Sequence, residues 1–124
     1  MGDVIFDKRD QLERIEASLL AGEEVEAVFD LKGAGTGFLG ITSRRVIFQD
    51  NSFLRKKTKA LVSIPYRSIH TIAAEDDVGL LAGRGFFSSS EIMIGTSSGG
   101  YEFEFRGGDK GHQAHHMILE HMLG

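Results

Sequence analysis

Short runs in which every second residue is apolar, separated by glycine-rich turns, constrain the fold of this chain more than any other feature. The first run begins at residue 25, with apolar side chains at Val25, Ala27, Phe29 and Leu31. A period of two predicts a strand with one buried face. Residues 92–96 and 101–105 flank the sequence Ser-Ser-Gly-Gly, which predicts a β-hairpin. With further runs, the pattern predicts seven strands, the others lying at 38–42, 44–49, 59–64 and 69–73.

Helices are predicted only near the two ends of the chain. Residues 7–21 carry apolar side chains at helical spacing on one face, with Asp7 as the expected N-cap, and a second such run follows Asp109. Because no helix lies between the strands, a parallel α/β sheet is excluded. The pattern predicts a mainly β fold with flanking helices, formed by two nearly orthogonal antiparallel sheets or a partly open barrel. One core is expected to contain Phe29, Ile47, Ile64, Ile72, Ile94, Phe103, Ile118 and Met122.

Composition is typical of a single globular domain. The 124 residues suffice for one hydrophobic core, and a hydrophobic content of 41% is too high for disorder. The absence of cysteine excludes disulfides and thiolate metal sites, and it fits a reducing cytoplasm. No apolar run reaches the length of a signal peptide core or of a membrane span. We therefore predict a cytoplasmic protein, for which any membrane contact is peripheral, at the inner face.

Charge is segregated along the sequence. Residues 1–30 carry nine acidic and three basic side chains, whereas residues 44–67 carry seven basic side chains and a single acid, Asp50. The formal net charge of −4 conceals this division. Opposite fields on one chain favour contact with a second copy of the chain, with an anionic surface or with an acidic protein.

Three strings resemble the bacterial pleckstrin-homology (PH)-like domains. They are GITSRRVIFQD at 40–50, VSIPYRSIHTI at 62–72, and the strand-plus-helix ending from Ile92 onward. The resemblance implies a PH-like seven-stranded barrel of two roughly orthogonal antiparallel sheets, capped by a C-terminal helix, over residues 23–124. Residues 1–22 are then an N-terminal helical extension. The resemblance also implies homo-oligomers, often ring-like, with a poorly defined cellular role. PH-like barrels bind lipids, peptides and proteins on one scaffold, so fold alone does not identify a ligand.

The basic segment is the first candidate binding site. In a PH-like fold, residues 53–59 form the turn between the third and fourth strands, where cations lie beside Phe53 and Leu54. Such a tip suits an anionic lipid or phospho-ligand, and it suits an acidic protein surface equally well. The alternative is a solvated hairpin whose charges prevent edge pairing. The candidate ligand-binding residues are Arg44, Arg45, Arg55, Lys56, Lys57 and Lys59.

Two apolar segments are candidates for contacts between subunits. A repeated contact between the acidic flank of one copy and the basic flank of the next would generate a ring. Buried apolar surface would supply the affinity of this contact. For the N-terminal helix, packing against its own domain is the competing interpretation. The candidate contact residues are Leu12, Ile15, Leu19, Leu80, Leu81, Phe86 and Phe87.

No motif has the spacing of a catalytic site. Residues 35–40 match G-x-G-x-x-G, but a strand follows them, so turn-forming glycines explain the match better than a nucleotide site. His112, His115 and His116 share one helical side without an evident fourth ligand, which favours exposed histidines over a metal site. The acidic run 75–77 lacks the spacing of a calcium loop. We predict a non-catalytic binding or assembly module that needs no cofactor and binds no nucleic acid.

Overall fold

The computed structural model describes residues 3–32, 36–50, 60–76 and 89–124. The chain divides into two compact units, residues 1–66 and residues 67–124. In chain order the elements are β1 (Ile5–Phe6), α1 (Arg9–Glu16), β2 (Val25–Asp30), β3 (Thr36–Thr42), β4 (Arg45–Asp50), β5 (Ala60–Pro65), the 3-10 turn η1 (Tyr66–Ser68), β6 (Ile69–Asp76), β7 (Ser89–Thr96), β8 (Gly99–Arg106) and α2 (Lys110–Leu123).

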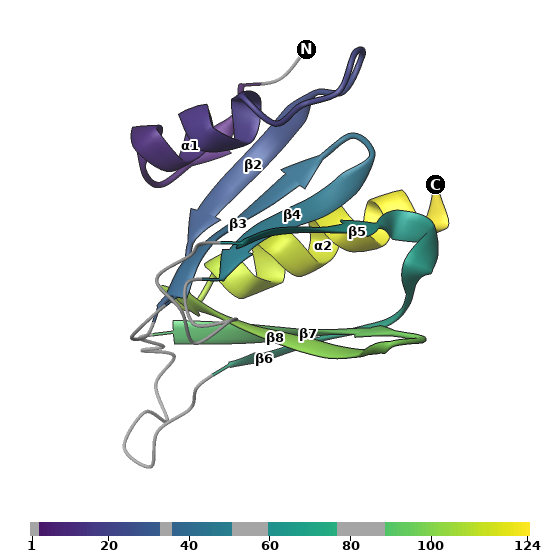
Figure 1. Ribbon diagram of the computed structural model, residues 1–124. Helices are drawn as coiled ribbons and strands as arrows, with labels where there is room; N and C mark the ends of the chain where they lie inside the picture. Colours follow the sequence, from purple (N-terminus) through teal and green to yellow (C-terminus); the bar gives the residue numbers. More distant parts are fainter. Residues whose placement is uncertain (1–2, 33–35, 51–59, 77–88) are drawn as a thin grey trace. The chain divides into compact units, whose positions relative to one another are not determined.

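A five-stranded sheet forms most of the first unit (Figure 1). Its strands follow one another in the order β1 to β5; β1 runs parallel to β2, and the other neighbours are antiparallel. Asp7 extends the β1 pairing, because its N–H donates to the Val28 carbonyl (3.1 Å) and its carboxylate accepts from the Asp30 N–H (2.9 Å). The sequence pattern missed β1, since two residues are too few to show a period.

Helix α1 covers one face of this sheet. Its buried residues Leu12 and Ile15 form a cluster with Val28, Phe38 and Ile47. The strand register places Val28, Gly40 and Ile47 next to one another on that face. A Cβ atom at Gly40 would lie 2.8 Å from the Ile15 Cδ1, so the absence of a side chain at this position lets α1 approach the sheet.

The opposite face of the same sheet is also buried. There the register aligns Phe29, Leu39 and Phe48, all of them buried. The prediction of one common core is therefore wrong for Ile47, which lies on the face covered by α1 while Phe29 lies on the other. Alternation predicts which residues share a face of the sheet. Strand β4 is apolar on both faces, so its pattern does not show which of the two faces is covered by α1.

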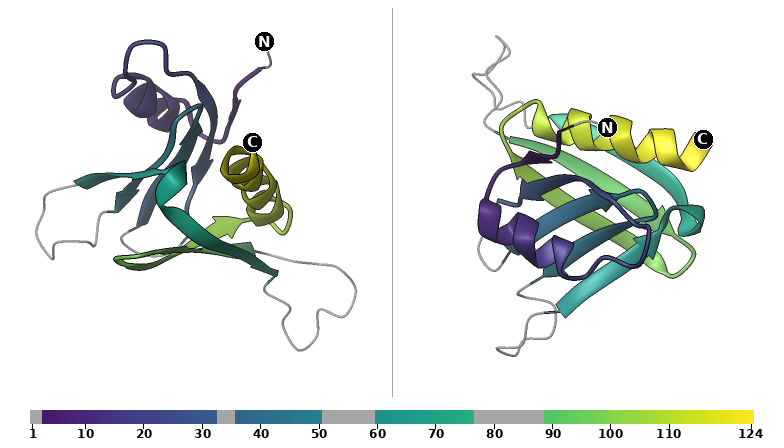
Figure 2. Two further views of the ribbon diagram at one scale, coloured as in Figure 1. Left: turned by 90° about the vertical axis from the view of Figure 1, so that its right-hand side faces the viewer. Right: turned by 90° about the horizontal axis from the view of Figure 1, so that it is seen from above.

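The second unit is a three-stranded antiparallel sheet, in the order β6-β7-β8, with α2 packed on one face (Figure 2). Ser90 on β7 joins the two layers: its Oγ accepts from the Gly111 N–H at 2.7 Å and donates to the Gly107 carbonyl at 2.9 Å. Since alternate residues of a strand share a face, Ile92 and Ile94 also point toward α2. Ala114 and Ile118 are the buried side chains of the helix.

The mainly β prediction is confirmed, and every predicted strand has a counterpart in the structure. Within the described residues, the strands form two sheets without a shared ladder. Helix α1 is shorter than the predicted 7–21, because hydrogen bonds of the turn type replace the helical pattern after Glu16. The predicted N-cap, Asp7, instead binds the backbone of β2, and Lys8 precedes the helix.

Candidate functional site

Arg45, a predicted ligand residue, is bound within its own unit. Its Nε donates to Glu23 Oε2 and its Nη2 to Glu23 Oε1, both at 2.9 Å. Its Nη2 also donates to the Ser18 carbonyl at 2.9 Å, and its Nη1 donates to Ser63 Oγ at 3.0 Å. The guanidinium group therefore joins the turn after α1 to the edge strand β5.

Glu23 completes this buried network. Its carboxylate, which has no exposed surface, also accepts from the Leu20 N–H (2.9 Å) and from the Thr42 hydroxyl (2.6 Å). The hydrogen bond from Arg45 lowers the pKa of Glu23 from its ordinary 4.5 to about 2, although burial acts in the opposite direction. The Tyr66 hydroxyl donates to the Thr42 carbonyl at 2.6 Å, and burial raises the Tyr66 pKa above its usual range. The network is thus a structural clamp, in which Glu23 stays ionised over the ordinary pH range.

The other predicted basic ligands are in different situations. Arg44 is exposed, immediately beside the clamped Arg45. Arg55, Lys56, Lys57 and Lys59 lie outside the described residues, so ligand binding by the basic segment remains a prediction.

The predicted subunit contacts of the N-terminal helix are partly used inside the chain. Leu12 and Ile15 are 5% and 0% exposed in the cluster beneath α1, and Leu19 packs partly against it. These side chains pack against their own domain, as the competing interpretation of the N-terminal helix predicts. The second predicted segment, Leu80, Leu81, Phe86 and Phe87, lies outside the described residues.

The acidic side chains near the N-terminus are also partly engaged internally. Asp30 is buried, and its Oδ1 accepts from Gln11 Nε2 at 2.7 Å and lies 3.6 Å from Lys8 Nζ. Asp7 and Glu23 bind backbone and side-chain donors as described above. The expected acidic flank of residues 1–30 is therefore weaker than a count of its charges indicates.

Several glutamates share one face of β6–β8, opposite α2, and sequence reasoning missed this arrangement. The register aligns Glu75, Glu91 and Glu104 in one row across the sheet. The next row places Met93 beside Glu102. We call these five residues the acidic face. The alternation of Glu102 and Glu104 was visible in the sequence, but their alignment with glutamates of two other strands depends on the register.

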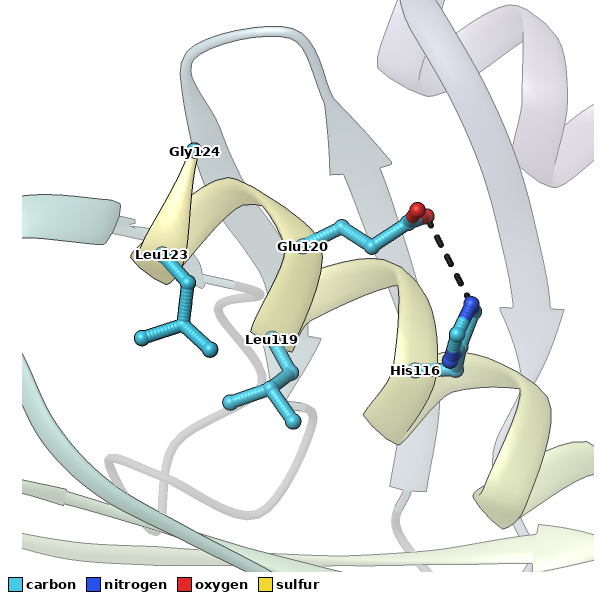
Figure 3. Close-up of a pocket in the computed structure, with 5 residues that line it drawn as sticks. All are labelled: His116, Leu119, Glu120, Leu123 and Gly124. Atoms are coloured by element: carbon cyan, nitrogen blue, oxygen red, sulfur yellow. Dashed lines mark ion pairs between the residues drawn. The ribbon is translucent and has the colours of Figure 1, made fainter.

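A shallow pocket lies at the C-terminal end of α2 (Figure 3). Its described lining residues lie on this helix or, for Gly124, at its C-cap, and Leu123 is 78% exposed. The His116 Nε2 lies 3.8 Å from the Glu120 Oε1 in an exposed pair. Within the part of the chain that the structure describes, no group of three or more His, Cys, Asp or Glu residues could hold a metal ion. The lining residues are His116, Leu119, Glu120, Leu123 and Gly124.

The G-x-G-x-x-G match has a packing explanation in the structure. Gly37 and Gly40 both lie in β3. A Cβ atom at Gly37 would collide with the Gln49 carbonyl oxygen of the neighbouring strand, and one at Gly40 would meet Ile15. Both glycines therefore permit close approach within this unit, and no helix begins after them to bind a phosphate.

None of the described helices is long and apolar enough to cross a membrane.

Comparison with known proteins gives one curated relative and several similar structures. The chain is 30% identical over 105 residues to the uncharacterized protein YozO of Bacillus subtilis strain 168, covering 85% of this chain and 83% of that protein. No family model matches the sequence. The crystal structure of a pleckstrin homology domain from Shewanella amazonensis SB2B matches 95% of the chain, with a TM-score of 0.68 and 21% identity.

Two further structures have similar folds. A DUF1696 family protein with a pleckstrin-homology domain from Shewanella loihica PV-4 matches 98% of this chain and 99% of its own, with a TM-score of 0.66 and 16% identity. The C-terminal domain of an unknown protein from Leishmania infantum gives a TM-score of 0.61 at 22% identity over 94% of this chain. These similarities show that the fold is PH-like.

Proposed function

Because the chain belongs to the bacterial PH-like domain family, we propose that it is a binding module that acts by self-association. In this proposal each copy offers a surface of one charge to a surface of opposite charge on the next copy. Contacts of this head-to-tail kind repeat, and they close into a ring when the rotation permits.

The observation that carries the proposal is a charge asymmetry between two parts of one chain. Residues 44–67 hold seven basic side chains, of which Arg45 is bound to Glu23, against one acid, whereas β6–β8 hold several glutamates and a single Lys or Arg, Arg106. The internal pairs of Glu23 and Asp30 remove charge from the N-terminal region, and for this reason the proposal assigns the acidic partner surface to the second unit.

Apolar side chains on the surface supply contact area for such an assembly. Leu20 is 56% exposed, Met93 40% and Leu123 78%. Complementary charges set the orientation and rate of association, whereas buried apolar surface supplies most of its affinity. The exposed side chains lie on a turn, a strand and a helix, and more than one of these can contribute to a subunit contact.

Multi-angle light scattering on the full-length chain tests the proposal. We expect a mass that is a multiple of 13.6 kDa at about 0.1 M salt and a lower mass at about 1 M salt, where the Debye length falls to about 3 Å. A monomer at every concentration and at low salt would contradict self-association. Vesicles containing phosphatidylserine form a second arm: a monomer that co-sediments with them would support the lipid prediction for residues 53–59 instead.

A further inference from the structure

We draw no further inference here: the strongest candidate, the surface patch of Leu119, Leu123 and the exposed His116–Glu120 pair at the C-terminal end of α2, carries no proposal, because nothing in the described part of the chain shows what covers it.

Discussion

Arg45 donates two hydrogen bonds to the carboxylate of Glu23, 22 residues earlier in the sequence: Nε lies 2.9 Å from Oε2, and Nη2 lies 2.9 Å from Oε1. The carboxylate is fully covered, and the guanidinium side chain is 18% exposed. Two parallel hydrogen bonds between charged groups are stronger and more directional than neutral ones. The pair therefore fixes the turn after α1 against the start of β4.

Replacing Arg45 should destabilise the fold far more than replacing its neighbour. Arg45→Met leaves a buried carboxylate without its cation, and we expect a loss of about 3–5 kcal/mol in the free energy of unfolding. Arg44→Met removes an equal charge from an exposed position and should change stability by no more than about 0.5 kcal/mol. Urea denaturation of the two variants makes the comparison, and equal losses would contradict the clamp.

Stability should depend on pH through Glu23. The pKa of this group is about 2 in the folded chain and about 4.5 when unfolded, so the unfolded chain binds the proton first as pH falls. Its contribution is complete above pH about 5 and is lost progressively as pH falls toward 2. We expect a loss on the order of 2 kcal/mol, because solvent at the guanidinium edge screens part of the interaction. Glu23→Gln should lack this component in a matched denaturation series, and an identical slope would exclude it.

Gly40→Ala should destabilise the first unit by about 1–3 kcal/mol, because its Cβ would lie 2.8 Å from the Cδ1 of the buried Ile15. Gly100→Ala is the control, since a Cβ there meets only the Ile94 carbonyl at 3.8 Å. Ile15→Val removes Cδ1, the nearest of the Ile15 atoms that the new Cβ would meet. The double variant should therefore lose less than the sum of the two single losses in thermal or chemical unfolding. Simple additivity would mean that the two sites do not interact.

Ser90→Ala should loosen α2 from its sheet. The substitution removes the acceptor of the Gly111 N–H, which belongs to the first turn of the helix and is buried. An unsatisfied buried donor costs about 1–3 kcal/mol. Hydrogen exchange of the α2 amides should accelerate along with that loss, whereas Ser97→Ala in the exposed β7–β8 turn should leave it unchanged. Unaltered exchange in Ser90→Ala would show that the helix is held by its apolar contacts alone.

Local sequence pattern predicted most of the secondary structure for an identifiable reason. Strands such as β2 and β8 alternate polar and apolar residues over several positions, and the Ser-Ser-Gly-Gly turn separates β7 from β8. A period of two and a turn signal are local properties, so a single sequence contains them. Strand β1 has two residues and owes its existence to pairing with β2, which no local pattern records.

The candidate surfaces were less predictable, because the sequence does not show which charged side chains are exposed in the fold or which of them lie side by side. Arg45 counted as a ligand residue in the sequence, yet folding brings it to Glu23 and removes both from the available surface. In the opposite direction, Glu75, Glu91 and Glu104 are separated by more than ten residues each, and only the register of β6, β7 and β8 makes them neighbours.

The sequence by itself therefore determined the strands other than β1, the presence of a helix near each end and the mainly β class, since these follow from side-chain periodicity and turn chemistry over a few residues. The tertiary structure alone decided that α1 packs on its own sheet, that Arg45 is a clamp and that the glutamates form one face. Each of these depends on which distant residues meet. That is set by the register of the strands and by the burial of apolar surface over the whole unit, and neither quantity can be read from a local window of sequence.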